Sequence, residues 1–301
     1  MTGYLHPRYA ASLSEFGDPL HLPRSGGWLL KRPVGGILVD AMGTYPLFVC
    51  ADWKSLQCDF DELGRSLVSV IAVTDPFGDY DEALLRDCFG DLVMPFKSHF
   101  VNDLRHPLDG AISKHHARNA CIGQKQVIVE RCEDAAVNLD DWVSLYSVLV
   151  QRHQISGIRA FSRVSFAKQL NTPGMVCFRA IRDGQTVGMI LWYVQNSVAY
   201  YHLGAYTDEG YELRASFALF RSALEHFAES GLVYANIGAG AGIGSGADDG
   251  LSRFKRGWSS RVRTAYLCGR IFDREEYDRL VRARGVEATD YFPAYRTGEF
   301  S

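Results

Sequence analysis

The chain has 301 residues, of which 47% are apolar and 22% are charged, and this is the composition of a globular protein. Its formal net charge of −3 excludes a strongly basic nucleic-acid-binding footprint for the whole chain and leaves room for local basic patches. No apolar run reaches the roughly 18 residues that a membrane-spanning helix needs, and the first residues lack the layout of a signal peptide. The seven scattered cysteines contain no C-x-x-C pair. We therefore expect a cytoplasmic protein with reduced thiols and no membrane span.

The first half of the chain predicts an α/β layer behind an irregular arm. Residues 1 to about 34 contain several prolines and glycines and show no sustained period, which is typical of an arm laid on the body of a protein. The apolar run 67–73 indicates a strand buried on both faces. The predicted strands are 37–39, 67–73, 96–104 and 126–130, and the predicted helices are 81–88 and 113–120.

The second half predicts two helices, a three-stranded meander, a long helix and two further strands. Apolar residues recur at helical spacing over 139–153, and Asp183-Gly184 is a strong hairpin signal. The predicted helices are 139–153, 162–170, 210–229 and 273–281. The predicted strands are 175–182, 186–194, 198–206, 232–237 and 262–268.

That element order resembles the acyltransferase order of the GNAT superfamily, and particular segments resemble its FemAB-related branch. The segments are the strand AYYHLGAY at 199–206, the helix opening at Gly210, the pair Ile237-Gly238, and GLSRFKRGW at 250–258. The resemblance covers roughly residues 140 to 270. It implies an α/β (α+β) fold of two tandem GNAT-like domains with mixed sheets flanked by helices. We expect a degenerate N-terminal domain at 1–135 and an acyltransferase domain at 136–301.

The same resemblance implies transfer of an acyl or aminoacyl group to a primary amine of a small molecule or peptide. The donor is acyl-CoA in some members of the superfamily and aminoacyl-tRNA in others. We take acyl-CoA as the first expectation, aminoacyl-tRNA as its alternative, and a binding module without catalysis as a third hypothesis. No metal and no DNA partner are expected.

One departure from the superfamily pattern bears on the donor. A GNAT protein holds the CoA pyrophosphate on a Gln/Arg-x-x-Gly-x-Gly/Ala turn and the helix that follows it. Here the turn reads TDEGY at 207–211, with two carboxylates and one glycine, while Arg214 is placed to reach an anionic group. The acidic turn and the basic run 253–263 favour tRNA. The residues expected to bind the donor are Leu203, Gly204, Ala205, Gly210 and Arg214.

The candidate catalytic residues are Lys255, His202 and Tyr206. In FemAB-like enzymes a lysine near this position steadies the acyl oxyanion, although Lys255 also fits a solvated basic run. His202 has a pKa suited to a general base, or it is a core histidine. Tyr206 is a candidate general acid. The residues expected to contact substrate are Tyr201, Phe254, Trp258, His115 and His116, and strand alternation sends Tyr201 and His202 to opposite faces.

Two further motifs have competing interpretations. The glycine-rich loop 238–246 fits a loose dinucleotide fingerprint, but no long helix follows it, which favours a loop that closes on substrate. The histidine-rich stretch from His99 to His116 has no zinc-site spacing. Within it, Lys114, His115, His116 and Arg118, together with Lys97, form either a cationic patch for an anionic substrate or an exposed helix face.

Overall fold

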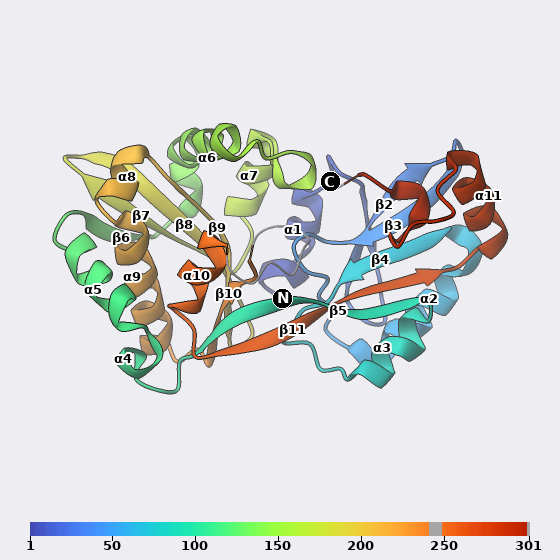
Figure 1. The fold of residues 1–301 in the computed structure, drawn as a ribbon, viewed down its shortest axis with the longest axis horizontal. Helices are drawn as coiled ribbons and strands as arrows, with labels where there is room; N and C mark the ends of the chain where they lie inside the picture. Colours follow the sequence, from blue (N-terminus) through green and yellow to red (C-terminus); the bar gives the residue numbers. More distant parts are fainter. Residues whose placement is uncertain (241–248, 300–301) are drawn as a thin grey trace. The chain divides into compact units, whose positions relative to one another are not determined.

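The computed structural model describes residues 1–240 and 249–299, which form two compact units. The first unit comprises Met1–Gly3 and Lys97–Arg263, and the second comprises Tyr4–Phe96 and Thr264–Ser301. Two long strands, β5 (Leu92–Asp103) and β11 (Arg261–Ile271), contribute residues to both units. Each unit contains β-strands and packed helices, which Figure 1 shows, so the predicted α/β class is confirmed. The predicted division at residues 135 and 136 stays a prediction.

In the second unit the strands follow the order β1-β2-β3-β4-β11. Neighbours are antiparallel except β3 and β4, which are parallel. Their inner faces bury a core around Phe48, Phe60 and Phe89. The elements are β1 (Asp18–His21), β2 (Trp28–Val34), β3 (Leu38–Gly43), β4 (Ser69–Val73), α1 (Pro7–Ser12), α2 (Leu56–Leu63), α3 (Glu82–Phe89) and α11 (Arg274–Arg284).

The irregular arm predicted for residues 1 to about 34 is wrong, because this stretch contains α1, β1 and β2. Its prolines occupy positions that regular structure tolerates. Pro7 lies in the first turn of α1, where a backbone N–H has no helical acceptor. Pro19 lies in β1, which ends the strand order and is therefore an edge strand. Tyr9 and Leu29 are fully buried, so the stretch belongs to the core.

In the first unit the strands follow the order β5-β10-β9-β8-β7-β6. Strand β10 is antiparallel to β5 and parallel to β9, and the remaining neighbours are antiparallel. Helix α9 packs on β7 and β8 and on α5, and α6 packs on β9. The elements are β6 (Ile128–Cys132), β7 (Met175–Arg182), β8 (Gln185–Gln195), β9 (Val198–Tyr206), β10 (Tyr234–Gly238), α4 (Leu108–Ala111), α5 (Lys114–Gly123), α6 (Leu139–His153), α7 (Arg163–Leu170), α8 (Asp208–Glu212), α9 (Ala215–Glu229) and α10 (Gly250–Arg256).

Several sequence predictions for this unit are confirmed. The predicted helix 139–153 and strand 198–206 coincide with α6 and β9. The Asp183-Gly184 hairpin has positive φ at both residues, 48° and 79°, as a type I′ turn requires. The predicted helix over 210–229 is wrong in one respect. It breaks at Arg214, whose φ of 59° is left-handed, so α8 and α9 are separate helices.

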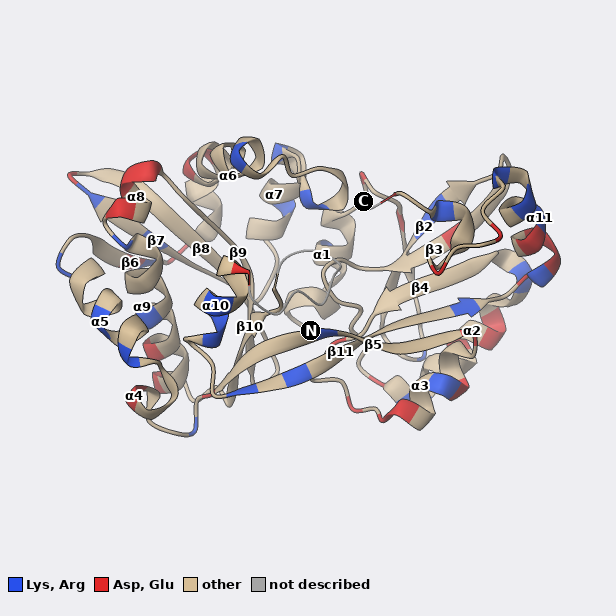
Figure 2. Cartoon of the chain, viewed as in Figure 1, with Lys and Arg blue, Asp and Glu red and all other residues tan. Residues whose placement is uncertain are grey.

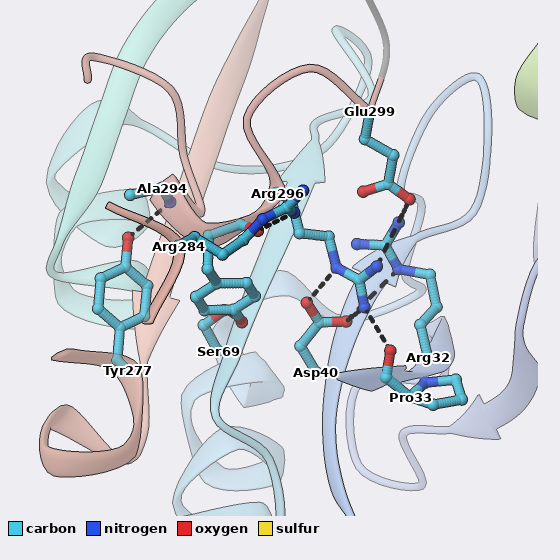
Figure 3. Close-up of polar contacts among 10 residues, drawn as sticks. Arg32, Pro33, Asp40, Ser69, Tyr277, Arg284, Ala294, Arg296 and Glu299 are labelled. Carbon is cyan, nitrogen blue, oxygen red and sulfur yellow. Dashed lines mark hydrogen bonds and ion pairs between the residues drawn. The ribbon is translucent and has the colours of Figure 1, made fainter. Parts of the chain in front are cut away.

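A buried carboxylate organises the second unit. Asp40 on β3 is fully buried, and its two oxygens accept hydrogen bonds from Arg296 Nε and Nη2 at 2.7 and 2.9 Å. Arg32 Nε lies 3.5 Å from the same carboxylate, and Arg32 Nη1 donates to Glu299 at 2.6 Å. Arg296 also donates to the carbonyl of Pro33 at 2.9 Å (Figure 3). These contacts tie the last described residues to β2 and β3.

We expect the substitution Arg296→Met to destabilise the protein strongly. It removes the bidentate partner of Asp40 and leaves a buried carboxylate with one remaining cation, a change that costs about 3–5 kcal/mol of unfolding free energy. Urea denaturation measures the loss. Arg279→Met is the matched control, because Arg279 belongs to an exposed pair with Glu276 worth less than about 1 kcal/mol. Similar losses in both variants would contradict this account of the buried network.

Candidate functional site

The strands β9 and β10 are paired for only part of their length. The parallel pairing joins Val198–Tyr200 with Tyr234–Asn236, and β9 then continues to Tyr206 without a further β10 partner in the described part of the chain. Beyond Asn236 the two strands therefore separate. The gap between them is bounded by residues 201–206 of β9 and by the end of β10 at Gly238.

A bulge in β9 changes which side chains face this gap. Trp192 of β8 pairs with Tyr201 and Leu191 pairs with Leu203, so His202 is an extra residue. Strict alternation would send residues 201 and 206 to opposite faces, whereas the bulge brings them to the same one. A Cβ on Gly204 would lie 2.3 Å from the Tyr201 hydroxyl and 3.1 Å from the Tyr206 hydroxyl. Glycine at 204 therefore makes room for both hydroxyls.

Both tyrosine hydroxyls are protonated at neutral pH. Burial raises the pKa of Tyr201 and Tyr206 well above the usual range. The Tyr201 ring also packs against Phe220 of α9, with ring centroids 4.9 Å apart. The two hydroxyls are hydrogen bonded to each other, so the pair offers one further hydroxyl donor at one edge of the gap.

The His202 side chain lies on the face of β9 opposite to that of Tyr201, as the alternation of adjacent strand residues predicts. Its Nε2 is hydrogen bonded to Gln169 Oε1 at 3.0 Å, and its ring packs against Phe161 and Tyr193. Burial lowers the pKa of His202 to about 3. These contacts separate His202 from Tyr201 and favour a structural role for it.

Lys255 of α10 reaches the gap between the two strands. Its side chain is buried, with 7% of the residue exposed, and its Nζ donates to the carbonyl of Ala239 at 2.6 Å. The Nζ lies 5.5 Å from the centroid of the Tyr201 ring. A Cβ on Gly238 would come within 3.0 Å of the same nitrogen. The ammonium group thus lies between a β9 ring and the end of β10.

The surroundings make this ammonium easy to deprotonate. Burial lowers the pKa of Lys255 to about 8, Asp249 opposes the shift, and Lys97 adds to it. The cation keeps three N–H donors, one of which is used by Ala239. Among the residues that the structure describes, the other N–H groups have no acceptor and could donate to an oxygen that develops negative charge.

His99 of β5 joins this site and was missed as a catalytic candidate. Its Nδ1 lies 3.0 Å from Asn236 Oδ1, which also accepts the N–H of Gly238 at 3.0 Å. Because that oxygen accepts, we assign the proton to Nδ1 and the lone pair to Nε2. Burial lowers the pKa of His99 to about 4, and Lys255 and Lys97 add to the shift. The contact joins residues 137 positions apart, so no local sequence pattern reveals it.

His116 holds α10 in place, whereas His115 does not. His116 Nε2 donates to the carbonyl of Phe254 at 2.9 Å, and Nδ1 accepts from the Ser113 hydroxyl at 2.9 Å. The close approach requires glycine at 257, since a Cβ there would lie 2.1 Å from the imidazole. His115 is exposed and contacts Asn119.

Phe254 of α10 and Trp258, which follows this helix, also act in packing. Phe254 and Trp258 lie with Phe217 and Phe220 in the core beneath α9, and Trp258 is fully buried. They fix the helix that carries Lys255. Direct contact of either residue with substrate stays a prediction.

The turn at 207–211 fits a pyrophosphate poorly. The N–H groups of Gly210 and Tyr211 in the turn already have acceptors within the chain, as do those of Leu213 and Arg214 just after it. The acceptors are Thr207 Oγ1 for Gly210, the Thr207 carbonyl for Tyr211, the Glu209 carbonyl for Leu213 and the Tyr211 carbonyl for Arg214. Asp208 and Glu209 add negative charge, and Asp208 pairs with Arg152. A Cβ on Gly210 would lie 2.1 Å from the Val187 carbonyl, so this glycine serves packing.

The other predicted donor-binding residues are divided between the two faces of β9. Gly204 borders the gap, whereas Leu203 pairs with Leu191 and Ala205 pairs with Met189. Ala205 is fully buried. Their contact with a donor stays a prediction.

Residues 241–248 of the glycine-rich loop lie outside the described part of the chain. The two interpretations of this loop therefore stay predictions. Over 1–240 and 249–299 we find no group of three or more side chains that would hold a metal ion. No helix in those ranges is long and apolar enough to span a membrane.

We expect the substitution Lys255→Met to change how stability depends on pH. Between about pH 8 and 10.5 the native lysine is neutral while the unfolded lysine still binds a proton, so the unfolding free energy rises with pH. A shift of this size corresponds to about 3 kcal/mol. The wild type should gain this stability relative to Lys255→Met, measured by urea unfolding from pH 7 to 10.5. The control Lys125→Met, at an exposed position, should not alter the pH dependence. Parallel curves for wild type and Lys255→Met would contradict the buried ammonium.

A comparison with known protein families gives a match to one family model within the first unit. Residues 115–256 match the family model described as Acetyltransferase (GNAT) domain. This range lies within the first unit and includes β9, β10 and α10. The curated proteins give no match to the chain.

Several solved structures share the fold over most of the chain. FemX matches with a TM-score of 0.68 and 13% identity, covering 92% of this chain and 94% of that one. The C-terminal DUF2156 domain of a proposed lysylphosphatidylglycerol synthetase from Agrobacterium fabrum matches with a TM-score of 0.61 and 16% identity, covering 87% of each chain. L-PGS from Bacillus licheniformis matches with a TM-score of 0.56 and 16% identity, covering 90% of this chain and 93% of that one.

At these identities the likenesses show the fold, which is FemX-like with GNAT-like domains in tandem. Residues 115–256 therefore match a GNAT acetyltransferase domain, and the chain has a FemX-like fold.

Proposed function

We propose that this protein transfers an aminoacyl group from aminoacyl-tRNA to a primary amine, at the gap between β9 and β10. The observation that carries the proposal is the buried Lys255 ammonium, held between the Ala239 carbonyl and the Tyr201 ring. A fixed cation in a site that excludes water stabilises the oxyanion of acyl transfer, and loss of such a donor typically costs about 10²–10³ in rate.

The reaction assigns each group a role. The amine nitrogen attacks the ester carbonyl, and the carbonyl oxygen becomes an oxyanion that accepts a hydrogen bond from Lys255. The nitrogen then loses a proton to the Nε2 lone pair of His99, and this transfer is favourable overall because collapse of the intermediate leaves a non-basic amide nitrogen. The C–O bond breaks, and the ribose oxygen of the tRNA takes a proton from Tyr206. The products are an amide and a free tRNA hydroxyl, and the enzyme is restored when His99 releases its proton to solvent and Tyr206 takes one up.

Two observations support tRNA over CoA as the donor. The turn that would hold a pyrophosphate carries two carboxylates, and its Gly210 and Tyr211 N–H groups are already engaged. The solved structures that share the fold over most of the chain include FemX and L-PGS, and the FemAB-like branch, which the sequence resembles, is the one in which aminoacyl-tRNA donors occur. We therefore take the alternative from the sequence as the main hypothesis.

Acyl-CoA remains the second candidate, because the matching family model is described as an acetyltransferase domain. A binding module without catalysis is the third. Measured turnover separates the module from both enzymes, and the donor that supports turnover separates the two enzymes from each other.

The donor is tested by offering the protein radiolabelled aminoacyl-tRNA and radiolabelled acetyl-CoA in parallel, with a panel of amine-containing peptides and small amines. We expect label to move from the aminoacyl-tRNA to an amine and none to move from acetyl-CoA. Transfer from acetyl-CoA alone would overturn the assignment of the donor. Absence of transfer from either would favour the binding module.

The role of Lys255 is tested by the pH dependence of turnover. Lys255→Met should lower kcat by about 10²–10³ and leave the far-ultraviolet circular dichroism unchanged. In the wild type the rate should rise with pH as the amine becomes neutral and fall above about pH 8 as Lys255 loses its proton. The falling limb should disappear in Lys255→Met. The control Lys125→Met should behave as the wild type, and an unchanged kcat in Lys255→Met would remove this residue from the mechanism.

A further inference from the structure

Two cysteines lie directly opposite each other on strands β6 and β7, and we call them the Cys132–Cys177 pair. The two strands are antiparallel, and their register places Cys132 against Cys177. The side chains of directly opposite residues on antiparallel strands project from the same face of the sheet. The two thiols are hydrogen bonded to each other. The fold thus brings together two sulfur atoms that are far apart in the sequence.

The position of this pair suits a disulfide bond. Directly opposite residues on antiparallel strands have Cα atoms about 4.5–5.5 Å apart, and disulfides join cysteines whose Cα atoms lie about 4.4–6.8 Å apart. The hydrogen bond between the thiols already holds the two sulfur atoms close to each other. An S–S bond therefore needs a short approach of the side chains and no change in strand register.

The two thiols differ in their access to solvent and in their acidity. Cys177 is fully buried, whereas Cys132 is half-buried and ends β6. The hydrogen bond with Cys177 lowers the pKa of the Cys132 thiol, burial opposes this shift, and Arg179 adds to it. The same hydrogen bond and burial raise the pKa of Cys177. Cys132 is therefore the thiol that meets a small oxidant first.

An ion pair holds Arg179 beside these thiols. Strands β6 and β7 both carry charged residues (Figure 2), and Arg179 Nε and Nη2 donate to Glu130 Oε2 at 3.1 and 2.9 Å. Arg179 Nη1 also donates to Asn138 Oδ1 at 3.2 Å. Glu130 and Arg179 are opposite each other, two positions along each strand from the cysteines, so both pairs share one face of the sheet. The guanidinium group is thereby fixed near Cys132, although Glu130 partly offsets its effect on the thiolate.

We propose that the Cys132–Cys177 pair is a reversible oxidation site, at which hydrogen peroxide converts the two thiols to a disulfide. The Cys132 thiolate attacks one peroxide oxygen, and the O–O bond breaks to give a sulfenic acid and a hydroxide ion, which takes up a proton and becomes water. The Cys177 sulfur then attacks the Cys132 sulfur, the S–OH bond breaks, and a second water leaves with the Cys177 proton. A dithiol reductant restores both thiols by thiol–disulfide exchange.

A metal ion is the competing ligand for two adjacent thiols, and the structure favours oxidation. A structural zinc site needs four ligands, usually thiolates and imidazoles. Among residues 1–240 and 249–299, no group of three or more histidine, cysteine, aspartate or glutamate side chains could hold a metal ion. Two thiols without a third ligand in those ranges fit a redox pair.

The disulfide would close a segment of the chain that covers one face of β9. The segment between the two cysteines contains α6 and α7. Helix α6 packs on β9, and Gln169 of α7 is hydrogen bonded to His202 of that strand. A cross-link between the ends of a segment lowers the entropy of the unfolded chain, so it favours the folded state. We therefore expect oxidation to stabilise the protein.

The oxidation site is tested on the intact, reduced protein. The protein is treated with hydrogen peroxide, its remaining thiols are blocked with N-ethylmaleimide, and its tryptic peptides are mapped by mass spectrometry without reduction. We expect a peptide containing Cys132 to be joined to a peptide containing Cys177, and the link to disappear after dithiothreitol. Absence of this link in the wild type would overturn the oxidation site, as would links from Cys132 to the exposed Cys58 and Cys121 as frequent as the link to Cys177.

Variants separate the roles of the two thiols. In Cys177→Ser the sulfenic acid on Cys132 should persist and react with dimedone, whereas Cys132→Ser should give neither the sulfenic acid nor the link. The matched control is Cys121→Ser, because Cys121 is an exposed thiol on α5, and this variant should form the same link as the wild type. Dimedone labelling of Cys177 in place of Cys132 would contradict the assigned order of attack.

Urea unfolding tests the effect of the disulfide on stability. Oxidised wild type should unfold at a higher urea concentration than reduced wild type, and the difference should vanish in Cys132→Ser. Equal midpoints for the two wild-type forms would overturn the stabilising effect of the closed segment. None of these measurements uses a donor or turnover, so the oxidation site and the proposed function stand or fall separately.

Discussion

The first unit depends on one constraint, which is that two parallel strands part after three paired residues. Beyond Tyr200 and Asn236 the backbones of β9 and β10 need other partners, because buried polar groups left without a hydrogen bond cost free energy. Lys255 meets part of this need by donating to the Ala239 carbonyl. The same contact places an ammonium where an acyl carbonyl would enter. Structural support and proposed chemistry thus use one side chain.

The rest of the unit maintains that arrangement. The bulge at His202 turns Tyr201 and Tyr206 to the same face, and Gly204 leaves room for their hydroxyls. His116 binds the end of α10 through the Phe254 carbonyl. Burial of the Lys255 ammonium costs desolvation free energy. The surrounding packing must therefore contribute more free energy than this cost. A lysine kept buried against that cost is more consistent with a site than with a solvated basic run.

The sequence allowed prediction of elements whose signals are local, such as the periodic helix over 139–153 and the Asp-Gly hairpin. It also pointed to Lys255, through a resemblance over 250–258. It failed where tertiary packing decides the outcome. The prolines near the N-terminus are tolerated at a first helical turn and a sheet edge, and the β9 bulge depends on its partner strand. The contact of His99 with Asn236 requires the antiparallel pairing of β5 with β10, which no spacing in one sequence reveals.

The most direct test of the account is photo-crosslinking with a 3′-aminoacyl-adenosine analogue whose acyl side chain carries a diazirine. The label should be mapped by mass spectrometry on the intact, folded protein. The account predicts labelled peptides from the second half of β9, around Gly204, and from α10, around Lys255, with competition by unlabelled aminoacyl-tRNA. Label confined to the His202 face beside Gln169, or label that aminoacyl-tRNA fails to displace, would contradict an acyl site between β9 and β10.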